Sequence, residues 1–215
     1  MHTINKHETA SFDVDAQKGF TPICPDELPV NGGDLIAPYL NENANLSRIR
    51  VGSKDAHPAN ALWNVTDEKP IFSEVDGDHP NVDIHWNSHC VSGTLGCELL
   101  DTLPHPQDYD FFVWKGVEPD MHPYGACFHD LGNKMSTGVI EYLKSQKIIN
   151  VILGGLATDF CVYNTAMQLI NADFKVFLVL DACRGIDEKT TMKKLKEMSN
   201  SGIIIVQNSN EINSI

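Results

Sequence analysis

The chain has 215 residues, with 16 Lys and Arg against 29 Asp and Glu, and its formal net charge at pH 7 is −13. This length suits one domain that buries roughly 70% of its unfolded surface and folds without disulfides or a structural metal. The negative charge disfavours nucleic-acid backbones and anionic membrane surfaces as partners, because both attract basic patches.

The chain offers no membrane segment and no export signal. Its longest apolar stretch, residues 151–157, is far shorter than the roughly 18 residues of a transmembrane helix, and the first residues lack the apolar core of a signal peptide. Six cysteines form no Cys-x-x-Cys pair. We therefore expect reduced thiols and a cytoplasmic location.

Short apolar segments recur along the chain and alternate with helical patterns in its second half. They predict buried strands at residues 11–14, 49–51, 110–114, 148–153, 175–180 and 203–206. Helices are predicted at residues 136–147, with Ser136 as a candidate N-cap, and at residues 160–171 and 188–198. This alternation indicates an α/β fold with a parallel sheet covered on both faces.

Residues 59–92 break the alternation. They follow Pro58, contain Pro70, Pro80 and two short acidic clusters, and show no clear period. We interpret them as a long ordered active-site loop within a single domain spanning residues 1–215, because loops of that length are usually functional.

In doubly wound sheets, ligands bind beyond the carboxyl ends of the strands. The polar residues that follow predicted strands are Asp15, Asp55 with His57, Lys115 and the segment 156–161. No Gly-x-Gly-x-x-Gly follows the first strand, which argues against dinucleotide binding.

Cys161 lies at the predicted start of a helix. The partial positive charge and free N–H groups there favour a thiolate and can hold an oxyanion, so Cys161 is a candidate nucleophile. The alternative is an inert buried thiol. Asp15 and Lys115, taken singly, are equally compatible with ordinary surface residues, but together with Cys161 they form a candidate nucleophile–base cluster.

Asp55 and His57 form an Asp-x-His pair at a strand end, with His89 further along the chain. One carboxylate and two imidazoles suit zinc, iron or manganese. The alternative is a hydrogen-bonded loop pair without metal.

Several short motifs in this order resemble the nicotinamidase/pyrazinamidase branch of the isochorismatase-like cysteine hydrolase family, over nearly the whole chain. They are VDAQKGF from Val14, DAHP from Asp55, WNSHCV from Trp86, KG at Lys115, YGACFHD from Tyr124, GLATDFCV from Gly155 and DACRG from Asp181.

The resemblance implies a three-layer αβα fold with a six-stranded parallel sheet. It further implies a set of site residues: a catalytic triad of Asp15, Lys115 and Cys161, an oxyanion hole from the backbone N–H groups of Ala157 and Cys161, a non-proline cis peptide bond between Leu156 and Ala157, metal ligands Asp55, His57 and His89, and substrate contacts from Phe20 and Trp86.

The implied activity is hydrolysis of nicotinamide to nicotinate and ammonia, a reaction of NAD salvage, with pyrazinamide as a further substrate to test. The implied cofactor is one divalent metal ion, with zinc the first choice and iron or manganese the alternatives. A cysteine amidase of the same family acting on another small amide is the alternative function. The residues leave open whether copies of the chain form a homo-oligomer.

Two positions depart from the family pattern. Ala61 stands where many members carry a further histidine, so water or a loop side chain such as Glu68, Glu74 or His79 is expected to complete the metal site. Asn87 and Ser88 precede His89 where proline is common, which predicts a looser loop.

Overall fold

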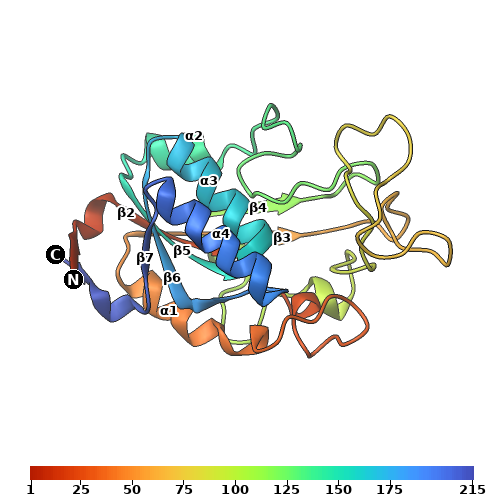
Figure 1. Ribbon diagram of the computed structural model, residues 1–215. Coiled ribbons are helices and arrows are strands. Elements are labelled where there is room, and N and C mark those ends of the chain that lie inside the picture. Colours follow the sequence, from red (N-terminus) through yellow and green to blue (C-terminus); the bar gives the residue numbers. More distant parts are fainter.

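The computed structural model describes residues 1–215 and has a six-stranded sheet at its centre (Figure 1). Every neighbouring pair of strands is parallel. Across the sheet the order is β4 (Phe111–Lys115), β3 (Ile49–Asp55), β2 (Thr9–Val14), β5 (Asn150–Leu156), β6 (Lys175–Arg184) and β7 (Ile204–Val206). The predicted six-stranded parallel sheet is confirmed.

Helices cover both faces of the sheet, as the α/β pattern predicts. Three of them, α2 (Val139–Ser145), α3 (Tyr163–Asn171) and α4 (Glu188–Asn200), lie on one face (Figure 1). The helix α1 (Ala37–Asn45) packs on the other face against β2, β5 and β6.

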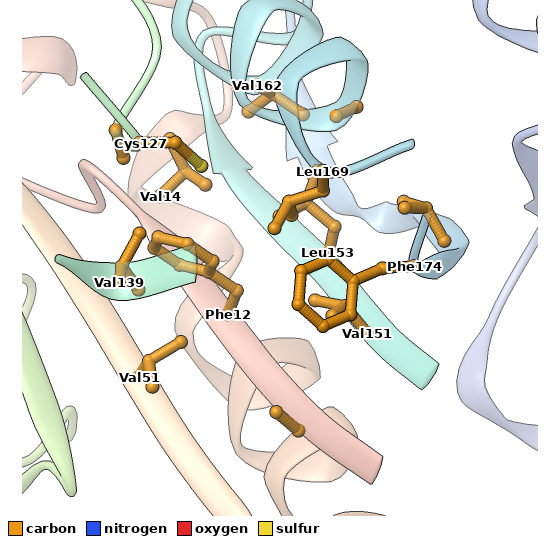
Figure 2. Close-up of a cluster of buried hydrophobic side chains, with 14 of the residues drawn as sticks. Phe12, Val14, Val51, Cys127, Val139, Val151, Leu153, Val162, Leu169 and Phe174 are labelled. Carbon is orange, nitrogen blue, oxygen red and sulfur yellow. The ribbon is translucent and has the colours of Figure 1, made fainter. Parts of the chain in front are cut away.

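The face under α2 and α3 is sealed by aliphatic and aromatic side chains. Figure 2 shows Phe12 and Val14 of β2 beside Val151 and Leu153 of β5, with Leu169 of α3 above them. These five side chains are fully buried. Alternate residues of each strand reach the same face, so the strands that carry the candidate site residues are anchored in a dry core.

Two features of the fold were not predicted. Helix α1 has an asparagine-rich sequence that conceals its apolar face, where Leu40 is buried and Pro38 fits the first turn. The short strands β1 (His2–Ile4) and β8 (Ile212–Ser214) pair with each other near the two termini, and three residues are too few to show a period.

Two predicted boundaries were wrong. Gly138 caps α2, and the Ser136 hydroxyl instead accepts a hydrogen bond from the Gly138 N–H. Strand β5 continues through Gly154 and Gly155 to Leu156. A Cβ at Gly155 would lie 1.9 Å from the Val14 carbonyl oxygen, so glycine there allows β5 to approach β2 closely.

Residues 59–92 contain no helix and form only isolated bridges, such as the one between Asn64 and Trp86. They lie at the end of the sheet opposite the two termini (Figure 1). Their buried side chains Trp63, Val82 and Trp86 join the same apolar cluster as α1.

All six cysteines are free. None of the helices has the length and apolarity that crossing a bilayer requires.

Candidate active site

Four neighbouring strands deliver the candidate site residues to one edge of the sheet. Asp55 and Lys115 end β3 and β4, Asp15 directly follows β2, and Cys161 lies five residues beyond β5. Chain order reverses between β2 and β5, so this edge is a topological switch point, where open α/β sheets bind ligands.

Lys115 is the centre of a buried polar group. Its Nζ lies 3.1 Å from Asp15 Oδ2 and 3.7 Å from Cys161 Sγ, and it also donates to Asp55 Oδ1. Lys115 and Asp15 have no exposed surface. We call Asp15, Lys115 and Cys161 the thiol cluster; the structure brings these three predicted residues together.

Burial and charge act against each other in the thiol cluster. Burial lowers the pKa of Lys115, but Asp15 and Asp55 overcome this and raise it well above its usual value, so the ammonium stays charged. Burial raises the pKa of Asp15, and the Lys115 charge offsets only part of that effect. Burial likewise raises the pKa of the Cys161 thiol well above its usual value, despite Lys115. Cys161 is therefore a neutral thiol that needs a base, whereas its place at a helix start had favoured a thiolate.

Side chains outside the thiol cluster fix its geometry. The Ser53 hydroxyl donates to Asp15 Oδ1 over 2.7 Å, which leaves Oδ2 towards Lys115. Cys161 lies in a π-helical turn, Thr158–Val162, that leads into α3. Asp159 in that turn accepts hydrogen bonds from the backbone N–H groups of Ile186 and Asp187, so the turn is tied to the start of α4.

The backbone before Cys161 has the form that the resemblance implies. The peptide bond between Leu156 and Ala157 is cis, as predicted. The Ala157 N–H donates to no acceptor in the protein, although Ala157 is 2% exposed and lines the pocket described below. A free, buried N–H of this kind beside the thiol can donate a hydrogen bond to an oxyanion and stabilise its charge.

Three imidazoles gather beside the thiol cluster. The potential ligand atoms of His57, His89 and His122 all lie within 4.8 Å of one another. All three rings are buried, and we call them the histidine cluster. Asp55 links the two clusters, because its Oδ1 accepts from Lys115 while its Oδ2 lies 3.5 Å from His57 Nε2.

The histidine cluster fits a divalent cation. His57 Nδ1 lies 2.9 Å from the Gly116 carbonyl oxygen and His89 Nδ1 lies 2.6 Å from that of Asn87. A carbonyl can only accept, so both Nδ1 atoms carry the proton and both Nε2 atoms present a lone pair. His57 Nε2 is buried without a partner and faces a carboxylate oxygen, an arrangement of two acceptors that a cation between them would satisfy. Burial and the neighbouring imidazole of His57 lower the pKa of His89 to about 3, which keeps its ring neutral.

A cavity beside Cys161 connects the two clusters. It is lined by Asp55, His89, Ala157 and Cys161, by the predicted substrate contacts Phe20 and Trp86, and by Leu28, His122, Pro123, Tyr124, Phe160 and Ile186. Most of this lining is apolar or aromatic, so the cavity suits a small planar ring whose reacting group reaches the thiol.

Comparison with known proteins identifies the family. The family model described as the isochorismatase domain matches residues 65–209. A curated nicotinamidase of Acinetobacter baylyi is 33% identical over 193 residues, which cover 88% of each chain. The protein belongs to the isochorismatase family, in its nicotinamidase/pyrazinamidase branch.

Solved structures of this family share the fold. A nicotinamidase and pyrazinamidase of Acinetobacter baumanii superimposes with a TM-score of 0.85 at 30% identity, over 95% of this chain and 98% of its own. A pyrazinamidase of Pyrococcus horikoshii, solved in complex with zinc, has a TM-score of 0.73 at 30% identity, over 93% of this chain and 99% of its own.

Sequence reasoning missed part of the site of this family member. His122 belongs to no motif that predicted a metal ligand, and its place beside His57 comes from the path of the chain after β4. Tyr124 and Phe160 were quoted within motifs without a role, and both line the cavity. Tyr124 accepts a hydrogen bond from Trp86 Nε1 and donates to Asp83, which fixes the aromatic wall.

The two departures from the family pattern have structural answers. Glu68 and Glu74 are exposed, and His79 joins no group of potential ligands, so none of the three completes the metal site as expected. Asn87 is held by a hydrogen bond in this structure. Its side-chain amide donates to the Glu27 carbonyl, while the Glu27 carboxylate accepts from the Cys90 N–H over 2.8 Å. Both flanks of His89 are thus fastened to Glu27.

Proposed function

We propose that this protein is a nicotinamidase, an amidohydrolase that converts nicotinamide to nicotinate and ammonia through a thioester on Cys161. The observation that carries the proposal is the thiol cluster at the edge of an aromatic cavity, beside the buried histidine cluster. The nicotinamidases and pyrazinamidases among its relatives support the substrate class.

Asp15 acts as the base. Its Oδ2 accepts the Cys161 proton, since the thiol is neutral at rest and the raised pKa of Asp15 makes it a better proton acceptor than an exposed carboxylate. Lys115 holds both carboxylates in place and compensates their charge. The sulfur then forms a bond with the amide carbon.

The backbone stabilises the charge that develops on the amide oxygen. The free N–H of Ala157 and the N–H of Cys161 form the oxyanion hole in this proposal, and loss of one such donor typically costs about 3–4 kcal/mol. As the C–N bond breaks, Asp15 returns the proton to the leaving nitrogen, which departs as ammonia and leaves a thioester.

Water completes the reaction. Asp15 takes a proton from a water molecule, whose oxygen attacks the thioester carbon. The C–S bond then breaks, the carboxylic acid leaves and gives its proton to solvent to become nicotinate, and the proton on Asp15 returns to the Cys161 sulfur. Every group thereby regains its starting protonation state.

We assign Asp55, His57 and His89 as ligands of a divalent cation, with zinc the first choice and iron or manganese as alternatives. When bound, the cation supplies a Lewis-acid position for the pyridine nitrogen and so orients the ring. The zinc complex of the Pyrococcus horikoshii relative supports zinc. Phe20 and Trp86 are proposed to hold the ring through their faces.

The test is ammonia release from nicotinamide by the purified protein, with Cys161→Ala as the blank. Release that vanishes in a folded Cys161→Ala variant supports substrate and nucleophile together, and retained turnover in that variant would contradict the nucleophile. If the wild-type protein releases no ammonia from nicotinamide or pyrazinamide, another small amide becomes the substrate to find.

A further inference from the structure

His122 carries a buried nitrogen that its surroundings do not satisfy. The ring is 4% exposed and its Nδ1 has no hydrogen-bond partner. Leaving such a group unpaired costs its full desolvation free energy. The ring centroids of Trp63 and Tyr124 lie 4.4 Å and 5.1 Å from that of His122. A phenylalanine could pack equally well against these two rings without burying an unpaired nitrogen. The His122 nitrogen therefore needs a binding partner, which a phenylalanine at this position would not.

The neighbouring histidines do not supply this partner by themselves. The rings of His122 and His57 lie 5.3 Å apart with 35° between their planes, and no hydrogen bond joins them. His57 Nε2 is itself buried and unpartnered. The three rings thus point nitrogen lone pairs toward a common position. Protonating one ring would leave the lone pairs of the other two unpaired, whereas a single cation can bind one lone pair from each ring.

We infer that His122 is a direct ligand of the divalent cation, in addition to Asp55, His57 and His89. The inference deepens the metal site of the proposed function and rests on it. Ala61 cannot supply the histidine ligand that many members of the family carry at this position. In this chain, the imidazole of His122, from the segment after β4, supplies that ligand in place of a loop side chain or water.

The spacing of the histidine cluster permits this. Two nitrogens that each lie about 2.1 Å from one tetrahedral zinc ion are about 3.4 Å apart. The ligand atoms lie within 4.8 Å of one another, so a shift of each ring by less than about 1 Å brings them to that spacing.

The backbone around His122 is held from both sides. Its N–H donates to the Asn81 carbonyl of the long loop over 2.8 Å, and the next carbonyl, that of Pro123, accepts from Lys115 over 3.1 Å. The ring is thereby fixed between the thiol cluster and the loop, as a pre-organised ligand should be.

A third imidazole also changes which cation the site prefers. Three nitrogens and one carboxylate favour zinc, cobalt and iron, while manganese and magnesium prefer sites richer in oxygen. We therefore expect zinc to remain bound when manganese is present in large excess.

Counting imidazoles in the zinc-loaded wild-type protein is the first test, by X-ray absorption fine structure at the zinc edge. Three imidazoles are expected. Two would overturn the inference, and so would a wild-type protein that binds no divalent cation at all. This measurement does not depend on any variant folding.

Zinc affinity of His122→Phe, from competition with a chromophoric chelator, is the second test. The loss should exceed about 100-fold, because even partners outside the ligand set cost 10–100-fold when removed. The matched control is His85→Phe: His85 is also buried and has an unpartnered Nε2, but lies outside the histidine cluster. Equal zinc affinity in His122→Phe and wild type would overturn the inference.

The outcome is separable from that of the proposed function. Zinc bound by three imidazoles in a protein that releases no ammonia from nicotinamide refutes the nicotinamidase proposal and leaves His122 as a ligand. Ammonia release with two imidazoles on the zinc does the reverse.

Discussion

The thiol cluster and the histidine cluster share Asp55 but are built in different ways. Asp15, Lys115 and Cys161 stand at or just beyond the ends of adjacent parallel strands, so the sheet register sets their spacing. Among the histidines, His89 lies in the long loop and His122 in the irregular segment after β4. One half of the site rests on a hydrogen-bonded sheet over a dry core, and the other on individual loop contacts.

This difference shows how one site can combine a rigid part with an adaptable one. Strand ends admit little variation, because a shift of one residue would turn each side chain to the other face. Loop contacts such as those of Glu27 with the residues around His89 can change one by one. We therefore expect the two clusters to respond differently to mutation.

Lys115→Met should give the largest difference between its effects on the thiol cluster and on the histidine cluster. Without the ammonium, two buried carboxylates lose their counter-charge, which costs about 3–5 kcal/mol of unfolding free energy in comparable pairs. We expect the rate of ammonia release to fall by more than about 1,000-fold while zinc still binds in full stoichiometry. Urea unfolding, metal analysis and the ammonia assay measure the three effects. Activity within tenfold of wild type would contradict the role of Lys115.

Alkylation of Cys161 should depend steeply on pH. The thiolate is the reactive form, and burial raises the pKa of this thiol, so little thiolate exists at pH 7 and more forms as the pH rises. In chelator-treated protein, the iodoacetamide rate should rise about tenfold per pH unit from 7 to 9, with no plateau. Labelling of Cys161→Ala corrects for the other cysteines. A plateau below pH 7 would instead indicate a resting thiolate.

Ser53→Ala tests the orientation of the base. The Ser53 hydroxyl stabilises the ionised form of Asp15 and so lowers its pKa; removing it should raise that pKa. A hydrogen bond to a charged group contributes about 1.5–3 kcal/mol, so kcat should fall roughly tenfold or more. We expect the acidic limb of the kcat/KM profile to move to higher pH, with recovery in Ser53→Thr. A move to lower pH would argue against this contact.

Glu27→Ala should have the smallest effect, and that effect should be confined to the histidine cluster. Cys90 N–H would lose its carboxylate acceptor, and a half-exposed contact of this kind contributes about 1 kcal/mol. We expect zinc affinity to drop about fivefold and Cys161 alkylation to stay unchanged. The exposed neighbour Asp26→Ala is the control. If alkylation slows as much as zinc binding weakens, the two halves of the site are not independent.

Much of the fold and of the thiol cluster could be predicted from local sequence. Buried parallel strands appear as continuous apolar runs, and the residues after such runs, Asp15 and Lys115 among them, must reach the same edge of the sheet. The cis bond before Ala157 is implied by the family resemblance and is present. Helix α1 was not predicted because only a few of its residues are apolar.

The sequence by itself therefore determined the sheet, the residues Asp15, Asp55 and Lys115 at the strand ends, the nucleophile candidate Cys161 beyond β5, and the family. Tertiary structure decided that His122 meets His57 and His89, and that Glu27 fastens the loop around His89. The physical reason lies in periodicity. Regular elements repeat a short pattern that is visible in the chain itself, whereas loop residues far apart in sequence meet only through contacts that the folded sheet makes possible.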